Sequence, residues 1–129
     1  MPRPLTERQL IGAAAEHAAC ELLQARGLRC LARNVRYPFG EIDLVMLDVA
    51  TVVFVEVRYR RNASFGGSAA SVDAGKRRRI ALAAQSWLTD NRKFAKAACR
   101  FDVVAVGGKA GALQSEWILA AFTLDDLAG

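Results

Sequence analysis

Apolar residues in two segments recur every three or four positions, which predicts two helices. The first is expected to begin after Thr6, because Thr6 and Gln9 have the spacing of a capping box. It is expected to end before Gly27, a residue type that commonly follows the last helical turn. The second helix is predicted from Asp73 to about Asp90.

The remaining apolar segments have the length and spacing of β-strands. Strands are predicted over 28–36, 41–47, 51–59, 100–106 and 117–122. The strand over 51–59 is almost continuously apolar up to Glu56, so it is expected to lie in the centre of the sheet with both faces covered. The short turn at 48–50 predicts that the strands on either side of it pair antiparallel. This order of elements predicts an α/β fold with a mixed β-sheet flanked by α-helices.

Length and composition favour one globular unit. The chain has 129 residues, 53% of them hydrophobic, so we expect a single domain over 1–129 with a loose arm at 1–5. No apolar run approaches the roughly 18–20 residues of a membrane-spanning helix, and charged residues interrupt any secretory signal at the start. The cysteines Cys20, Cys30 and Cys99 lack C-x-x-C spacing, which favours buried thiols and a cytoplasmic location.

Positive charge is concentrated in one part of the sequence. The net charge is +5, and seven of the 18 Lys and Arg residues fall within positions 58–79. These are Arg58, Arg60, Arg61, Lys76, Arg77, Arg78 and Arg79. Such a cluster is suited to the phosphate backbone of a nucleic acid. Taken alone it is equally consistent with a solvated basic surface that binds nothing.

Two carboxylates interrupt the predicted apolar strand pair. Asp43 lies between Ile42 and Leu44, and Glu56 follows the most apolar strand. A turn at 48–50 would bring these carboxylates close together, and a hard divalent cation relieves their mutual repulsion. Arg58 is two residues beyond Glu56, so it is expected on the same face of the strand, beside the carboxylates. The alternative is a structural ion pair at an exposed strand end.

Glu16 in the first predicted helix is a third candidate. Its neighbours on the helix are all small: Gly12, Ala13, Ala19 and Cys20. A helix with small residues on one side can approach a sheet closely and deliver a carboxylate to a crowded site. The alternative is an exposed glutamate of the kind common on helix surfaces.

The candidate residues lie in segments that together resemble a known family. The segments are Gly12 to Ala19 with Glu16, Arg33-Asn34, Gly40 to Leu44, Phe54 to Arg60, Phe65-Gly66 and Arg100 to Val104. From about Gly12 to Val106 the chain resembles the YraN-like family of bacterial proteins, uncharacterised protein family 0102. That family is placed in the PD-(D/E)XK nuclease superfamily, near the archaeal Holliday-junction resolvases.

The resemblance implies a restriction-endonuclease-like core and a nuclease dependent on Mg²⁺ or Mn²⁺. It places Asp43 on the metal-binding Asp, Glu56 on the Glu of the E-x-K element and Glu16 on the first-helix Glu of the resolvase-like branch. The Val57 carbonyl is expected as a further metal ligand. Arg58 occupies the usual Lys position, where it can hold a phosphate but cannot lose a proton to act as a base.

The leading hypothesis is an endonuclease that hydrolyses DNA phosphodiester bonds, with branched DNA as one candidate substrate. In it Arg58 contacts the scissile phosphate, the other residues of the basic cluster contact flanking phosphates, and Glu41 supports the metal from the side of Asp43. A second hypothesis is a module of the same fold that binds nucleic acid with little or no cutting. A third is an interaction protein for another DNA-processing factor. A resolvase role would require a homodimer, which the sequence does not show.

Overall fold

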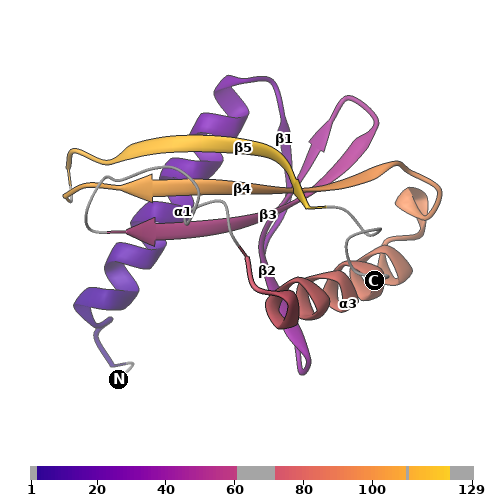
Figure 1. Ribbon diagram of the computed structural model, residues 1–129, viewed down its shortest axis with the longest axis horizontal. Coiled ribbons are helices and arrows are strands. Elements are labelled where there is room, and N and C mark those ends of the chain that lie inside the picture. The colour runs from indigo at the N-terminus through magenta and orange to yellow at the C-terminus, as the bar shows by residue number, and fades with distance from the viewer. Residues whose placement is uncertain (1–2, 61–71, 110, 123–129) are drawn as a thin grey trace.

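The computed structural model describes residues 3–60, 72–109 and 111–122 (Figure 1). Its elements are α1 (Glu7–Ala25), β1 (Arg29–Tyr37), β2 (Gly40–Asp48), β3 (Thr51–Arg60), α3 (Ala74–Asp90), the short 3-10 helix η1 (Arg92–Phe94), β4 (Cys99–Gly107) and β5 (Gln114–Phe122). The strands form one sheet in the order β1-β2-β3-β4-β5. Only the β3–β4 pair is parallel, so the sheet is mixed and the predicted α/β class is confirmed.

The helices α1 and α3 cover opposite faces of the sheet (Figure 1). On one face, Ala19 and Leu23 of α1 are completely buried against the central strands. On the other face, Ile80 and Trp87 of α3 are buried, and Trp87 meets the ring of Phe54 edge-on with the centroids 6.0 Å apart. No helix in the described residues is long and apolar enough to cross a membrane.

The central position predicted for the apolar strand is confirmed. The segment 52–55 of β3 is at most 1% exposed, with its side chains divided between the two faces. The capping box at Thr6 and the positive φ of Gly27, 95°, delimit α1 as predicted. Strand β5 begins three residues before its predicted start, because the polar residues 114–116 join the ladder through their backbone.

Some predictions fall on parts of the chain outside the described residues. They concern Arg61 of the basic cluster, a loop that the sequence predicts over 62–71 with Phe65-Gly66, and a helical turn that it predicts over 123–127. The expectation of buried thiols was right for Cys20 and wrong for Cys30 and Cys99, which are partly exposed. All three are unpaired thiols, as expected.

The tip of the β1–β2 hairpin extends past β3 and rests on α3 (Figure 1). A Cβ atom built on Gly40 would lie 2.4 Å from the backbone oxygen of Arg79, so the strand and the helix touch backbone to backbone. The Tyr37 hydroxyl donates a hydrogen bond to Asp90 Oδ2 at 2.8 Å, near the other end of the helix. The hairpin tip is therefore fixed against α3 at two places.

A buried carboxylate fastens β5 to β4. Asp102 is 0% exposed and accepts hydrogen bonds from Trp117 Nε1 and from the backbone N–H of Ala120, both at 2.9 Å. Arg100 Nε lies 3.1 Å from the same side chain and supplies the opposite charge. The register of the two strands shifts at this position, and Asp102 binds the N–H group of the irregular segment.

Candidate active site

Asp43 lies where β2 separates from β3. The last backbone pair of this ladder joins Leu44 to Val55, and the next residues on the two strands are Asp43 and Glu56. Asp43 Oδ2 accepts a hydrogen bond of 2.8 Å from the backbone N–H of Val57. The Asp43 side chain thus replaces the backbone hydrogen bonding to β3 at the point where the backbone of β2 turns away. The structure brings Asp43 beside Glu56, as the sequence predicted.

Glu56 is buried on the side of the sheet that faces α3. Val55 and Val57 pack into the core beneath α1, so the alternation along β3 directs Glu56 and Arg58 to the opposite face. Glu56 is 7% exposed, and its Oε1 lies 2.6 Å from Nζ of Lys76 in the first turn of α3. A buried carboxylate is costly without such a partner. Lys76 therefore compensates the charge of Glu56 in this state of the protein.

Glu16 approaches the same region from α1. Burial raises the pKa of Glu16, the hydrogen bond with the Asn34 side chain lowers it, and the charge of Glu41 raises it again. Asn34 has a left-handed φ of 50° and lies opposite Asp43 on β1, between the neighbouring ladder pairs. Asn adopts this conformation more readily than most residues. The irregularity in β1 therefore places the Asn34 side chain against Glu16.

The ionisation of Asp43 is opposed by its surroundings. Burial and the nearby charge of Glu56 raise its pKa to about 7, against the hydrogen bond from Val57 N, which lowers it. The charges of Glu16 and Glu41 add to the increase. The charges of three other acidic residues, from α1, β2 and β3, therefore all act on Asp43.

The acidic side chains match a hard divalent cation in chemistry, because they offer only oxygen ligands. Their present contacts are with protein donors: Glu56 with Lys76, Glu16 with Asn34, and Asp43 with backbone. Within residues 3–60, 72–109 and 111–122, no three Asp, Glu, His or Cys side chains form a preassembled metal cluster. Lys76 is paired with Oε1 of Glu56, so an ion at this carboxylate would either share it with Lys76 or displace the ammonium group.

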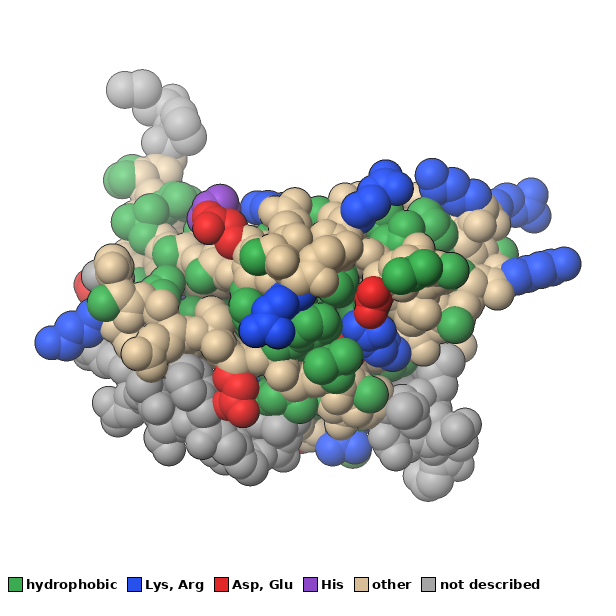
Figure 2. All heavy atoms as spheres, turned by 90° about the horizontal axis from the view of Figure 1, so that it is seen from above, with side chains coloured by type: hydrophobic (Ala, Val, Ile, Leu, Met, Phe, Trp, Pro, Cys, Tyr) green, Lys and Arg blue, Asp and Glu red, His purple; other side chains and the backbone are tan. Residues whose placement is uncertain are grey.

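The predicted basic cluster separates into different environments. Arg58 is partly buried on β3, while Arg60, Arg78 and Arg79 are exposed. Arg77 is held within the protein: its Nε donates to the carbonyl oxygen of Val72 at 2.6 Å, and its guanidinium lies 5.7 Å from the centroid of the Phe122 ring. Arg61 is outside the described residues. Basic side chains also lie elsewhere on the molecule, as the face shown in Figure 2 illustrates.

A hollow of about 390 Å³ brings one of these acidic residues, Glu41, close to two basic residues. It lies between the hairpin tip and α3, and its lining includes Glu41, Lys76 and Arg79. The hollow therefore has one carboxylate, that of Glu41, on the hairpin side and two cations on the helix side. A phosphate accompanied by a metal ion has charges that complement both walls.

Sequence reasoning missed the roles of two residues here. Asn34 was part of the family segments, but no role was inferred for it, although an Asn within a strand is a signal of a left-handed residue. The sequence predicts a phosphate contact for Lys76 and gives no sign of its ion pair with Glu56. That contact depends on the docking of α3, for which the local sequence gives no signal.

The mixed sheet with a helix on each face, and an Asp–Glu pair where two strands separate, matches a restriction-endonuclease-like core. Residues 15–106 match the model of the family described as "Uncharacterised protein family UPF0102", and the chain belongs to this family. The matched range contains Glu16, Glu41, Asp43 and Glu56. The family predicted from the motifs is thereby confirmed.

Several bacterial proteins are similar to this chain over nearly their whole length. A UPF0102 protein of Xanthomonas campestris pv. campestris (strain B100) is 54% identical over 119 residues, which are 92% of this chain and 96% of that protein. One from Pseudomonas entomophila (strain L48) is 53% identical over 86% of this chain and 91% of its own. A UPF0102 protein of Xylella fastidiosa (strain M12) is 51% identical over 95% of this chain and 99% of its own length.

The raised pKa of Asp43 predicts a pH-dependent cost in stability. Between its ordinary value of 3.8 and about 7, the folded chain keeps a proton that the unfolded chain loses, so stability falls as the pH rises through this range. Asp43→Asn removes the ionisable group and retains an acceptor for Val57 N. Urea unfolding with a chelator present measures the free energy of unfolding at each pH. The value for Asp43→Asn should equal that of the wild type near pH 4 and exceed it at pH 8 by up to ~4 kcal/mol.

Asp73→Asn is the matched control for this measurement. Asp73 caps α3, and the hydrogen bond from Lys76 N lowers its pKa, so its ionisation favours folding. Above about pH 4, Asp73→Asn should be less stable than the wild type, whereas Asp43→Asn should be more stable. Equal stability of Asp43→Asn and the wild type at pH 8 would contradict the environment assigned to Asp43.

Proposed function

We propose that this protein is a metal-dependent endonuclease that hydrolyses phosphodiester bonds in DNA, with branched DNA as one candidate substrate. The observation that carries the proposal is the meeting of Asp43 and Glu56 where β2 leaves β3, with the Asp43 pKa raised to about 7. Carboxylates that repel one another in a buried site are stabilised by a divalent cation. Glu16, Asp43 and Glu56, with the Val57 carbonyl, would hold Mg²⁺ or Mn²⁺.

The residues around the carboxylates divide the remaining tasks. The bound ion, when present, would polarise the phosphate and activate water. Arg58 lies on the same face as Glu56, two residues further along β3, and would bind the scissile phosphate through its planar guanidinium. Since Arg keeps its proton at all ordinary pH values, its part is binding and charge stabilisation.

The exposed cations near the site support binding of the flanking DNA. Arg60 on β3 and Arg78 and Arg79 on α3 present side chains to solvent, so we assign them to flanking phosphates together with Lys76 and Arg61. Arg77 was in the same predicted set. Its contacts with Val72 and Phe122 favour a positioning role, in which it fixes the start of α3.

The alternative is a nucleic-acid-binding module of the same fold that cuts little or not at all. The contact between Lys76 and Glu56 favours it, because an internal ammonium already neutralises a carboxylate that the nuclease hypothesis gives to the metal. Arg in place of Lys at position 58 also favours it. The two functions share the DNA-binding surface and differ in whether the carboxylates bind an ion.

A cleavage assay separates the two functions. Wild-type protein is offered single-stranded, duplex, flap and four-way-junction DNA with Mg²⁺ or Mn²⁺. Cleavage is expected on at least one of these substrates, and Asp43→Ala and Glu56→Ala are each expected to abolish it while DNA binding is retained. Both substitutions remove a proposed metal ligand from the site.

Glu21→Ala is the control, because it also removes one carboxylate from the chain. Glu21 is exposed on α1 and pairs with His17, so cleavage should be unchanged. Normal cutting by Asp43→Ala or Glu56→Ala would show that the site is assigned wrongly. Binding without cutting on every substrate would favour the binding module.

Lys76→Met tests whether Lys76 and a metal ion compete for Glu56. The substitution keeps an apolar stem and leaves a buried carboxylate unpartnered, so the free energy of unfolding should fall by about 2 kcal/mol without metal. Mn²⁺ should then raise the melting temperature of Lys76→Met more than that of the wild type.

Arg78→Met is the control for this effect, since Arg78 is an exposed cation in the same helical turn. Its response to Mn²⁺ should equal that of the wild type. Equal Mn²⁺ responses in Lys76→Met and the wild type would argue against a metal site at Glu56.

The salt dependence of DNA binding distinguishes Arg78 from Arg77. Arg78→Ala should weaken binding to all sequences similarly and reduce the slope of log K against log salt by about one. Arg77→Ala should mainly lower the melting temperature, because its side chain is engaged within the protein. Fluorescence anisotropy at several salt concentrations measures the slope. A sequence-dependent loss in Arg78→Ala would contradict a phosphate contact.

A further inference from the structure

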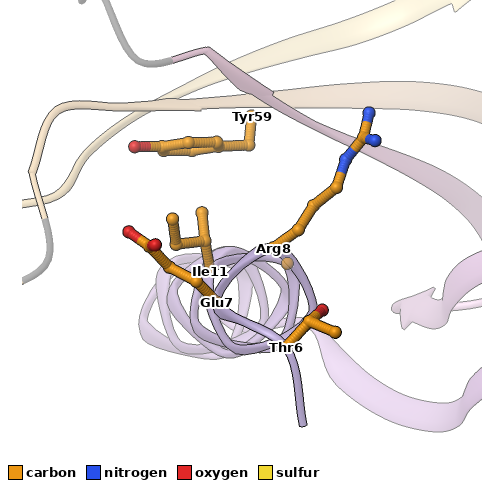
Figure 3. Close-up of a pocket in the computed structure, with 6 residues that line it drawn as sticks. Thr6, Glu7, Arg8, Ile11 and Tyr59 are labelled. Atoms are coloured by element: carbon orange, nitrogen blue, oxygen red, sulfur yellow. The ribbon is translucent and has the colours of Figure 1, made fainter.

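A groove of about 870 Å³ lies between the start of α1 and the end of β3 (Figure 3). Its lining includes Thr6, Glu7, Arg8, Ile11 and Gly12 of the helix end and Tyr59 of the strand. Figure 3 shows the flat face of the Tyr59 ring turned towards the helix, with Ile11 below it and the charged side chains of Glu7 and Arg8 to either side. The groove thus has two apolar walls and polar groups at its margins.

The ring of Tyr59 is held in a fixed position. Its hydroxyl donates a hydrogen bond of 2.6 Å to the carbonyl oxygen of Gly108, at the end of β4. The same ring also lines a second hollow of about 330 Å³, with Leu10 and Lys109 in its lining. A fixed aromatic ring with a cation near each hollow is a feature of surfaces that bind single-stranded nucleic acids.

The groove is aligned with Glu16 along α1. Arg8, Gly12 and Glu16 are spaced four apart, so they follow one line along α1 from the groove to the carboxylate site. On the strand, Tyr59 is two residues beyond Val57, whose N–H binds Asp43. A DNA strand lying along this line would pass from the groove to Glu16, on the α1 side of the sheet.

Gly12 keeps the groove open without being required by the packing. A Cβ atom at this position would meet no atom of the described structure within 4 Å. Glycine in the middle of a helix costs stability relative to alanine. Since no contact within the described chain requires the small residue, its effect is to leave room in the groove.

We propose that this groove binds an unpaired nucleobase of a DNA strand that enters the carboxylate site. The base stacks on the face of Tyr59 with Ile11 on its other side, Arg8 binds an adjoining phosphate, and Glu7 accepts a hydrogen bond from an N–H group of the base. The inference rests on the proposed function and narrows its substrate: DNA with a single-stranded segment next to the scissile bond, such as a flap or an open junction.

Substitutions that fill the groove or remove its ring test the inference. Gly12→Leu adds a strong helix former whose side chain would occupy the groove, and Tyr59→Leu removes the stacking surface. Binding of a labelled oligothymidylate and of a blunt hairpin duplex is measured by fluorescence anisotropy. Both variants should bind the oligothymidylate at least about fivefold more weakly than the wild type, a loss on the order of one stacked base. Their affinity for the duplex should change by less than about twofold.

Ala13→Leu is the matched control, because it adds the same side chain to the neighbouring, exposed position of α1. It should bind both probes as the wild type does. Tyr59→Phe keeps the ring and should retain most of the binding. Melting curves establish that each variant is folded. If Tyr59→Leu is unfolded, the binding measured with Gly12→Leu tests the inference.

The outcomes separate this inference from the function on which it rests. Wild-type protein that binds neither probe would overturn the proposed DNA-binding function and the inference with it. Wild-type protein that binds both probes, with Gly12→Leu binding the oligothymidylate equally well, would overturn the inference alone. An equal loss on both probes would also overturn it, because the groove would then serve duplex and single strand alike.

Discussion

The hydrogen bond from Val57 N–H to the Asp43 carboxylate holds two strands together at the place where their backbones part. Where β2 leaves β3, the charges of Glu16 from α1 and Glu41 from the hairpin act on Asp43. The buried segment 52–55 of β3 comes directly before Glu56, and its packing in the core fixes the position of this residue. The stability of the hydrophobic centre thus compensates the unfavourable burial of carboxylates at its edge.

The run of four basic residues at the start of α3 shows how a helix distributes similar side chains among different tasks. Consecutive residues point about 100° apart around the helix axis, so neighbours in sequence face different surroundings. Lys76 meets Glu56, Arg77 turns back to Val72 and Phe122, and Arg78 and Arg79 face solvent. A cluster that is uniform in sequence is therefore not a uniform surface.

Much of the fold was predictable because the periodicity of apolar residues directly reflects which faces are buried. The adjacency of Asp43 and Glu56 was predictable as well, since the short turn at 48–50 leaves little freedom in the register. The separation of β2 from β3 was not, because it depends on the left-handed Asn34 and on contacts of the hairpin with α3. The pairing of Lys76 with Glu56 likewise joins residues that only tertiary packing brings together.

The contact between Gly40 and the backbone of Arg79 has a mechanical consequence. With no side chain between them, the strand and the helix have no soft layer that could absorb a small displacement. A shift of α3 as its arginines engage a ligand would be transmitted along β2 to Glu41 and Asp43. Conversely, a rearrangement of the carboxylates would displace the surface of α3. A single glycine thus brings two regions with opposite charge into direct backbone contact.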